Sequence, residues 1–220
     1  MHLISKNLVT ITKKSQIKVF NYETCEFVKS FDTNNTRARL LKILDNQNLL
    51  LIFDGETVIK QLDFDTGNIV NTYNGHREQT FLIQVLTSDT FASCTLTQIK
   101  IFNIGTGECL KTFEEDFGVL CDIQLTEYGH LITCSSSRPK LRIWNDNGFV
   151  NLSKIETSSQ IKRIKVLSND RLVCFCPNRE YNTLKMKISI WDLNTQKCLN
   201  SFPIDDEDFM PNRFEFSSFM

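Results

Sequence analysis

A short motif recurs five times along this chain at nearly constant spacing. Each copy starts with an aliphatic residue, places a large apolar residue three positions later and follows it directly with Asn or Asp. The copies begin 42, 40, 42 and 47 residues apart, at Ile17, Ile59, Ile99, Leu141 and Ile188. A chain with such a period is built from copies of one structural unit, and each copy buries its apolar face against the next.

The second copy shows what one unit contains. Four apolar runs follow one another and predict four strands, here named a to d, over Ala38–Leu44, Leu49–Phe53, Val58–Asp63 and Ile69–Tyr73. Turn residues such as Asp54-Gly55 separate these runs, and no segment keeps the 3.6-residue period of a helix. Four strands in roughly 40–45 residues are typical of a β-propeller blade. We therefore predict an all-β fold, a β-propeller of about five four-stranded blades.

At the motif strands the chain resembles the WD-repeat β-propeller family. Trp191-Asp192 is the dipeptide that names the family, and Gly75-His76 stands just after a closing aromatic residue, where the family places Gly-His. The resemblance runs from about Leu8 to Phe202. It implies that a set of motif residues is structural, with the aromatic side chains filling the space between blades: Phe20, Phe102, Trp144, Trp191 and Asp192.

One feature of the family is expected to be mostly absent. In WD repeats a hydrogen-bonded set links the Gly-His histidine, a Ser or Thr of strand b, the motif Trp and an Asp of the b–c turn. His76 and Ser93 are available here, but the motif aromatic beside them is Phe102, which has no indole N–H. The b–c turn Thr95–Gln98 contains no Asp.

The chain is predicted to form one domain over residues 1–220. Its repeats cover approximately 1–31, 38–73, 78–113, 118–155 and 160–202, and residues 203–220 hold an acidic linker and a candidate closing strand. The first repeat supplies only strands b, c and d, beginning at Leu8. Two arrangements stay open. Either Arg213–Ser217 completes the first unit and closes a five-bladed ring, or the chain is a fragment of a larger propeller, since WD-repeat proteins commonly have about seven blades.

Composition and charge narrow the class of partner. The 220 residues include 25 Lys or Arg and 26 Asp or Glu, and the net charge of −1 provides no basic field for nucleic acid or an anionic membrane. The N-terminal segment lacks the apolar core of a signal peptide, and no apolar run is long enough to span a membrane. The eight cysteines form no Cys-x-x-Cys, which predicts buried free thiols in a reducing compartment. We expect a cytoplasmic protein, with the nucleus as the alternative.

No catalytic motif is found in the sequence. The P-loop, Gly-x-Ser-x-Gly and His-Glu-x-x-His patterns are absent, and His2, His76 and His130 are far apart. His130 is interpreted as a solvated residue of an a–b turn. We predict no enzymatic activity, no cofactor and no metal. The alternatives are a propeller enzyme, a hydrolase or lyase with its site in the central channel, and a truncated gene product with no independent role.

The function follows from the resemblance, which implies a non-catalytic scaffold for protein–protein interaction. In this family, partners commonly dock on the face formed by the d–a and b–c loops. The candidate protein-binding residues in these loops are Arg37, His76, Arg77, Arg138, Arg179 and Tyr181. The expected partners are other proteins or peptides, for instance a substrate recognised within a ubiquitin-ligase or signalling assembly. Nucleic acid, membranes and small-molecule substrates are not expected.

Overall fold

A computed structural model describes residues 2–5, 8–13, 16–21, 23–33, 37–44, 46–114, 119–145, 151–157, 160–177 and 186–204. Within these ranges the chain forms twenty strands in five four-stranded sheets, and the described residues contain no helix. In every sheet, neighbouring strands follow one another in the sequence, as in β1-β2-β3-β4. The prediction of an all-β fold built from repeated four-stranded units is confirmed.

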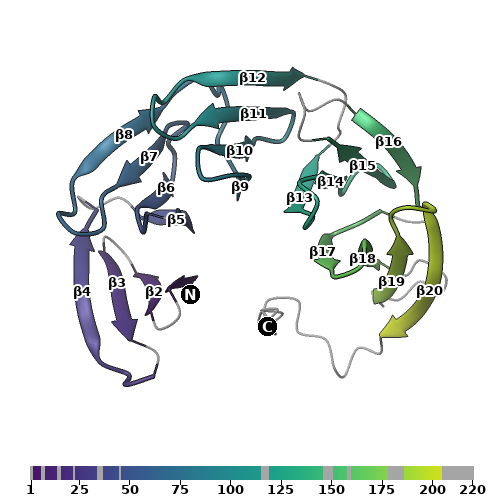
Figure 1. Cartoon of the computed structure of the whole chain (residues 1–220), viewed down its shortest axis with the longest axis horizontal. Helices are drawn as coiled ribbons and strands as arrows, with labels where there is room; N and C mark the ends of the chain where they lie inside the picture. Colours follow the sequence, from purple (N-terminus) through teal and green to yellow (C-terminus); the bar gives the residue numbers. More distant parts are fainter. Residues whose placement is uncertain are drawn as a thin grey trace. The chain divides into compact units, whose positions relative to one another are not determined.

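The structure separates into two compact units, Met1–Leu120 and Cys121–Met220. The first unit contains three sheets (Figure 1). The first sheet consists of β1 (His2–Ser5), β2 (Leu8–Lys13), β3 (Gln16–Asn21) and β4 (Phe27–Asp32). The second consists of β5 (Ala38–Ile43), β6 (Leu49–Phe53), β7 (Ile59–Leu62) and β8 (Ile69–Tyr73). The third consists of β9 (Leu82–Val85), β10 (Thr90–Cys94), β11 (Gln98–Asn103) and β12 (Cys109–Glu114).

The second unit contains the fourth and fifth sheets. The fourth consists of β13 (Leu120–Leu125), β14 (Leu131–Ser135), β15 (Lys140–Trp144) and β16 (Asn151–Glu156). The fifth consists of β17 (Arg163–Leu167), β18 (Arg171–Pro177), β19 (Met186–Asp192) and β20 (Lys197–Ile204). All five sheets thus repeat the order a-b-c-d, and each motif lies on strand c.

The first sheet contains a strand that the sequence did not reveal. Strand β1 pairs antiparallel with β2, with His2 opposite Thr10, and supplies the strand a that the first repeat was predicted to lack. That prediction is wrong because a four-residue strand between polar residues is too short to show a recognisable pattern. The first sheet therefore has four strands without Arg213–Ser217, which lies, like the acidic linker, outside the described residues.

The core of the first unit lies between its sheets. All five residues of β6 are buried, and alternate side chains point to opposite faces of the sheet. Leu49 and Leu51 belong to an apolar cluster with Ile17 of the first sheet, whereas Leu50 and Ile52 pack in a cluster with Phe91 of the third. A strand covered on both faces needs apolar residues at every position. This explains why strand b reads as a continuous apolar run.

The cysteines are less uniformly buried than predicted. All eight are free thiols, and Cys94, Cys134, Cys174 and Cys176 are buried as small apolar residues of strand b. The prediction is wrong for Cys25, Cys109 and Cys198, which are exposed. These three lie in a c–d turn or at the start of strand d, where the sheet has no further neighbouring strand to cover them.

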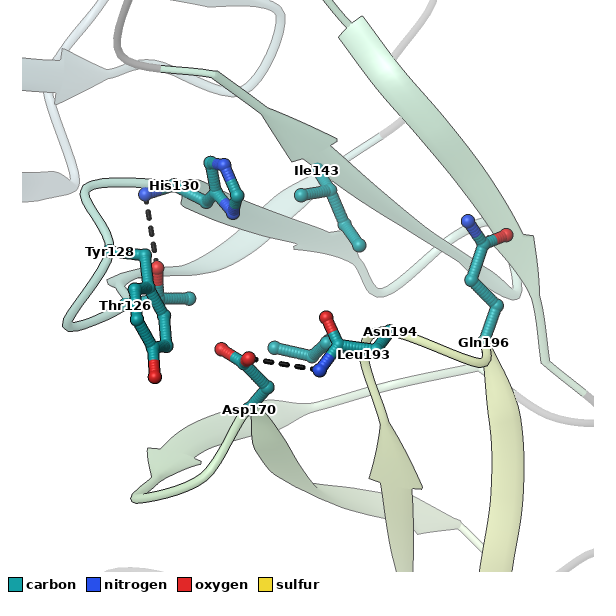
Figure 2. Close-up of a pocket in the computed structure, with 8 residues that line it drawn as sticks. All are labelled: Thr126, Tyr128, His130, Ile143, Asp170, Leu193, Asn194 and Gln196. Carbon is teal, nitrogen blue, oxygen red and sulfur yellow. Dashed lines mark hydrogen bonds between the residues drawn. The ribbon is translucent and has the colours of Figure 1, made fainter.

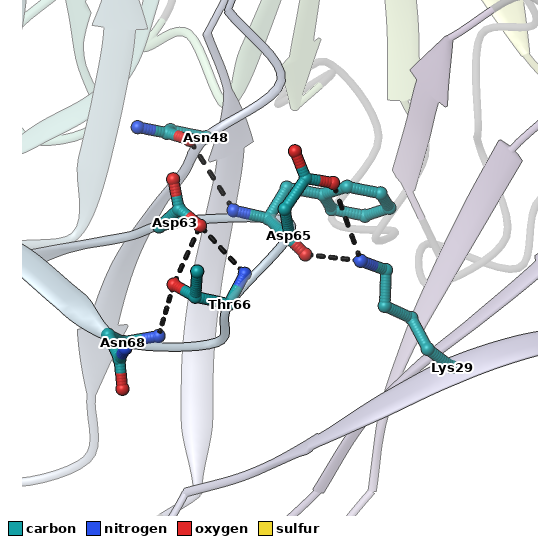
Figure 3. Close-up of polar contacts among 7 residues, drawn as sticks. Lys29, Asn48, Asp63, Asp65, Thr66 and Asn68 are labelled. Atoms are coloured by element: carbon teal, nitrogen blue, oxygen red, sulfur yellow. Dashed lines mark hydrogen bonds and ion pairs between the residues drawn. The ribbon is translucent and has the colours of Figure 1, made fainter.

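In the four c–d turns that the structure describes, the Asn or Asp of the motif builds the turn from strand c to strand d. Asp63 Oδ1 accepts hydrogen bonds from the backbone N and the Oγ1 of Thr66, both at 2.7 Å (Figure 3). Asp192 accepts the same two bonds from Thr195, at 2.7 and 2.9 Å. These bonds stabilise the carboxylate and lower the pKa of Asp63 and of Asp192. The predicted structural role of Asp192 therefore has a specific form, the start of a turn.

In each of these c–d turns, the residue that follows the turn threonine has a positive φ. The values are +58° for Cys25, +75° for Gly67, +75° for Gly107 and +57° for Gln196. In all five hairpins the strand register then shifts within the last residues of strand c, as between Ile101 and Phe102. A left-handed residue beside a bulge suits glycine, which carries no Cβ.

Replacing Gly107 with alanine is expected to lower the free energy of unfolding by about 1–2 kcal/mol or slightly more. The added Cβ would lie 2.8 Å from Asn71 Oδ1, and the amide of Asn71 donates to the carbonyl of Ile104 at 3.1 Å. Gly55→Ala is the matched control, because Gly55 has a φ of +79° and no atom of the described residues lies within 4 Å of the added Cβ. Urea unfolding should show the larger loss for Gly107→Ala; equal losses would mean that the Asn71 contact contributes nothing.

In the first unit, strand d of one sheet contacts the c–d turn of the next. Lys29 of β4 donates a hydrogen bond to the carbonyl of Phe64, lies 3.9 Å from the centre of its ring and 3.9 Å from Asp65 Oδ1 (Figure 3). Asn71 of β8 makes the corresponding bond to the carbonyl of Ile104. These contacts join consecutive sheets at the edge where the c–d turns lie.

Candidate functional site

The d–a loops of the first unit present two exposed arginines. Arg37 precedes β5 and Arg77 precedes β9, and both side chains are exposed. The carbonyl of Arg37 accepts a hydrogen bond from the backbone N of Asp54 at 3.0 Å, so this d–a loop is held against the adjacent b–c loop. The structure therefore brings the two predicted kinds of loop together at one edge of the second sheet.

The remaining predicted binding residues are distributed differently. Arg138 is exposed in the b–c turn of the fourth sheet, where its backbone N donates to Ser135 Oγ at 3.3 Å. Arg179 and Tyr181 lie outside the described residues. His76 is only 6% exposed, so its side chain lies behind the loop surface. The exposed arginines of the described loops are thus divided between the two units.

His76 forms a buried polar pair. Its Nε2 lies 2.7 Å from Ser93 Oγ on strand b of the third sheet, and its ring contacts that of Phe102 edge-on at 6.2 Å between centroids. Sequence reasoning identified both polar residues but expected their network to be mostly absent, because Phe102 replaces the motif Trp. The histidine–serine contact is present without the indole.

A second polar pair occupies the equivalent place in the fourth sheet. The indole Nε1 of Trp144 donates to Thr133 Oγ1 at 3.1 Å, and both residues are buried. Thr133 lies opposite Arg142 in the strand register, just as Ser93 lies opposite Lys100. The polar network was expected to be mostly absent, but in this sheet the link between the motif Trp and the strand-b hydroxyl is present. The missed signal was the hydroxyl residue two positions before the end of strand b.

The fifth sheet lacks this pair. Its residue at the same register position is Cys174, opposite Ser189, and the buried indole N of Trp191 has no hydrogen-bond partner among the described residues. A thiol is a weak acceptor, so it does not substitute for a hydroxyl. Trp191 is also only half-buried, in contrast to Trp144.

The free energy of unfolding of the wild type is expected to decrease as the pH falls from 6.5 to 4, because of His76. Burial of the ring, together with the nearby Lys100 ammonium, lowers the pKa of His76 from 6.5 to about 4. Because the unfolded chain takes up the proton near pH 6.5 and the folded chain does so only near pH 4, acidification favours unfolding across this window. The contribution approaches about 2–3 kcal/mol at pH 4.

Unfolding free energies at pH 7, 5.5 and 4 test this for the wild type and for His76→Gln. As the pH falls, the free energy of unfolding should decrease more for the wild type than for His76→Gln. A constant difference would show that His76 titrates alike in both states.

A cavity of about 420 Å³ opens in the second unit between the a–b turns and the following c–d turn (Figure 2). Ile143 and Leu193 provide its apolar part. The polar lining consists of Thr126, Tyr128, His130, Asp170, Asn194 and Gln196. His130 lies in an a–b turn as predicted, but it is half-buried in this lining instead of fully solvated.

The polar groups of the cavity are partly ordered. Asp170 Oδ2 accepts a hydrogen bond from Asn194 Nδ2 at 3.0 Å, and the backbone N of His130 donates to Thr126 Oγ1 at 3.0 Å (Figure 2). Such a lining can hold a polar group of a ligand by hydrogen bonds. Sequence reasoning missed this cavity because it is built from three turns that are 23 or more residues apart in the sequence. One signal could have found it: within a four-stranded antiparallel sheet, the a–b and c–d turns lie at the same end of the strands, so their polar residues are close together.

Neither the scan of protein-family models nor the search of curated proteins finds a match for this chain. Within the described ranges, no helix is long and apolar enough to cross a membrane. No group of three or more His, Cys, Asp or Glu side chains in this part of the chain is arranged to hold a metal ion.

Proposed function

We propose that this chain is a WD-repeat-like β-propeller module whose five sheets are its blades, either complete or part of a larger propeller. The observation that carries this proposal is a polar pair that recurs in two sheets. In each, a hydroxyl residue of strand b bonds to a histidine of the preceding d–a loop or to the tryptophan of strand c. His76 and Ser93 form one part of the family's hydrogen-bonded set in the third sheet, and Thr133 and Trp144 form another in the fourth. The repeated turn that starts at the motif Asn or Asp supports the same assignment.

The module acts as a non-catalytic scaffold that binds another protein or a peptide through its d–a and b–c loops. In the parts of these loops that the structure describes, Arg37, Arg77 and Arg138 are exposed. Arginine is enriched at the centres of protein interfaces, because its planar group makes several hydrogen bonds. Recognition of a substrate within a ubiquitin-ligase or signalling assembly is one version of this role.

Affinity capture with charge-reversed loops tests the proposal. Tagged wild type is compared with Arg37→Glu/Arg77→Glu, which reverses the charge of the two exposed arginines in the d–a loops of the first unit. Arg171→Glu/Lys197→Glu is the matched control, because it makes the same change in charge at exposed residues beside the a–b and c–d turns. Thermal melts confirm that all three proteins are folded.

The captured partner should be lost with the first variant and kept with the control. Equal capture by all three proteins would contradict the loop assignment. Failure of folded wild type to capture any protein would contradict the scaffold role.

A further inference from the structure

Two thiols in the fourth sheet lie in direct contact. Cys121 of β13 and Cys134 of the neighbouring β14 have their sulfur atoms 3.2 Å apart. The two sulfurs need to approach by only about 1 Å to form a bond of about 2.05 Å.

The two thiols differ in exposure. Cys121 is half-buried, whereas Cys134 is only 2% exposed. Burial raises the pKa of Cys134, and the adjacent Cys121 thiol raises it further. A small oxidant therefore meets Cys121 first, because nucleophilic attack requires an accessible thiolate.

We propose that Cys121 and Cys134 are a reversible modification site, at which hydrogen peroxide joins them in an intrachain disulfide. The Cys121 thiolate attacks one peroxide oxygen, the O–O bond breaks, and the departing hydroxide takes up a proton to become water. This leaves a sulfenic acid on Cys121. The Cys134 sulfur then loses its proton and attacks the Cys121 sulfur, and the S–O bond breaks to release a second water. Two thiols and one peroxide thus give one disulfide and two waters.

The bond would alter a contact between the two sheets of the second unit. In the reduced protein, Cys121 Sγ–H donates to the carbonyl of Ile161 at 3.1 Å, just before β17. A disulfide sulfur carries no hydrogen, so oxidation removes this bond. The neighbouring link remains, in which Asp122 Oδ2 accepts from the backbone N of Ile164 at 3.0 Å.

The test uses a background without the exposed thiols, Cys25→Ser/Cys109→Ser/Cys198→Ser. Folded protein is treated with hydrogen peroxide, denatured with excess alkylating reagent and digested with trypsin. Cys121 and Cys134 fall in one peptide, Thr112–Lys140, because trypsin does not cleave between Arg138 and Pro139 and no other Lys or Arg lies between Lys111 and Lys140. The disulfide lowers the mass of this peptide by about 2 Da relative to the unalkylated dithiol. Cleavage after Glu127 then places the two cysteines on different fragments, which separate only after reduction.

The expected result is this linked peptide from folded protein, restored to the dithiol by a reductant. In the same background, Cys134→Ser should give an oxidised Cys121 without a link. A peptide that stays fully alkylated, a link from Cys121 to Cys174 instead, or a link that forms only after denaturation would overturn the proposal.

Discussion

Replacing Trp144 with alanine is expected to lower the free energy of unfolding by about 3–5 kcal/mol. The side chain is 2% exposed and lies on strand c of the fourth sheet, and its indole N–H bonds to the buried Thr133 hydroxyl. Alanine would leave a cavity and would also leave that hydroxyl without its donor. Urea unfolding of the purified chain measures the loss.

Trp191→Ala provides the comparison for Trp144. From the sequence alone the two tryptophans are equivalent, and replacing either with alanine would be expected to lower the free energy of unfolding by the same amount. In the structure Trp191 is half-buried, and its indole N has no hydrogen-bond partner in the described part of the chain, so the loss should be clearly smaller than at Trp144. Thr133→Val, which removes only the acceptor, should cost about 1 kcal/mol. A loss at Trp191 that equals or exceeds the loss at Trp144 would contradict this ranking.

Replacing Tyr73 with alanine is the second large change, also about 3–5 kcal/mol. Tyr73 is 1% exposed between the second and third sheets, with its ring 4.8 Å from that of Phe91 and 5.7 Å from that of Phe102. Its hydroxyl lies 2.5 Å from Gln61 Oε1 and 2.8 Å from the carbonyl of Ile104. The residue thus supports apolar packing and a polar link to the next c–d turn.

Tyr73→Phe separates these two contributions. It keeps the ring but leaves the buried acceptors of Gln61 and Ile104 without the hydroxyl, so it should cost about 1–3 kcal/mol. Equal losses for the phenylalanine and alanine variants would show that ring packing contributes little.

The Tyr73 hydroxyl also predicts a pH effect. Burial raises the pKa of Tyr73 from 10 to about 12. The folded chain therefore keeps this proton when the unfolded chain loses it, and the associated stability is present below pH 10 and lost as the pH rises towards 12. Tyr73→Phe lacks this loss. Unfolding free energies of both proteins between pH 9 and 11 test it; parallel curves would contradict it.

The repeat made the architecture predictable. Strands b and d of the second sheet, Leu49–Phe53 and Ile69–Tyr73, have the predicted bounds, because long apolar runs and glycine turns mark them. Strand β1 was missed because a four-residue strand carries too little pattern. The pattern of apolar residues therefore explains why the strands of the second sheet were predicted and why β1 was not.

The candidate site was less predictable because it depends on contacts between repeats. The sequence offered His76 and Ser93 as members of a polar set that was expected to be mostly absent, and it placed His76 among the candidate protein-binding residues. The burial of His76 depends on the packing of Phe102 and Lys100 around it. The cavity lined by His130 and Asp170 joins turns of two different sheets. The contrast between Trp144 and Trp191 likewise depends on a neighbouring strand, which supplies Thr133 in one sheet and Cys174 in the other.

A crystal structure of the chain is the most direct test of the central claim, that the five repeats are propeller blades. If the repeats are blades, each four-stranded sheet should pack face to face on the next, with strand a of every sheet nearest one common axis and strand d outermost. Strand β1 should also be strand a of the first sheet. Sheets that stack in a row without a common axis, or a first sheet completed by a strand from residues 213–217 in place of β1, would contradict it.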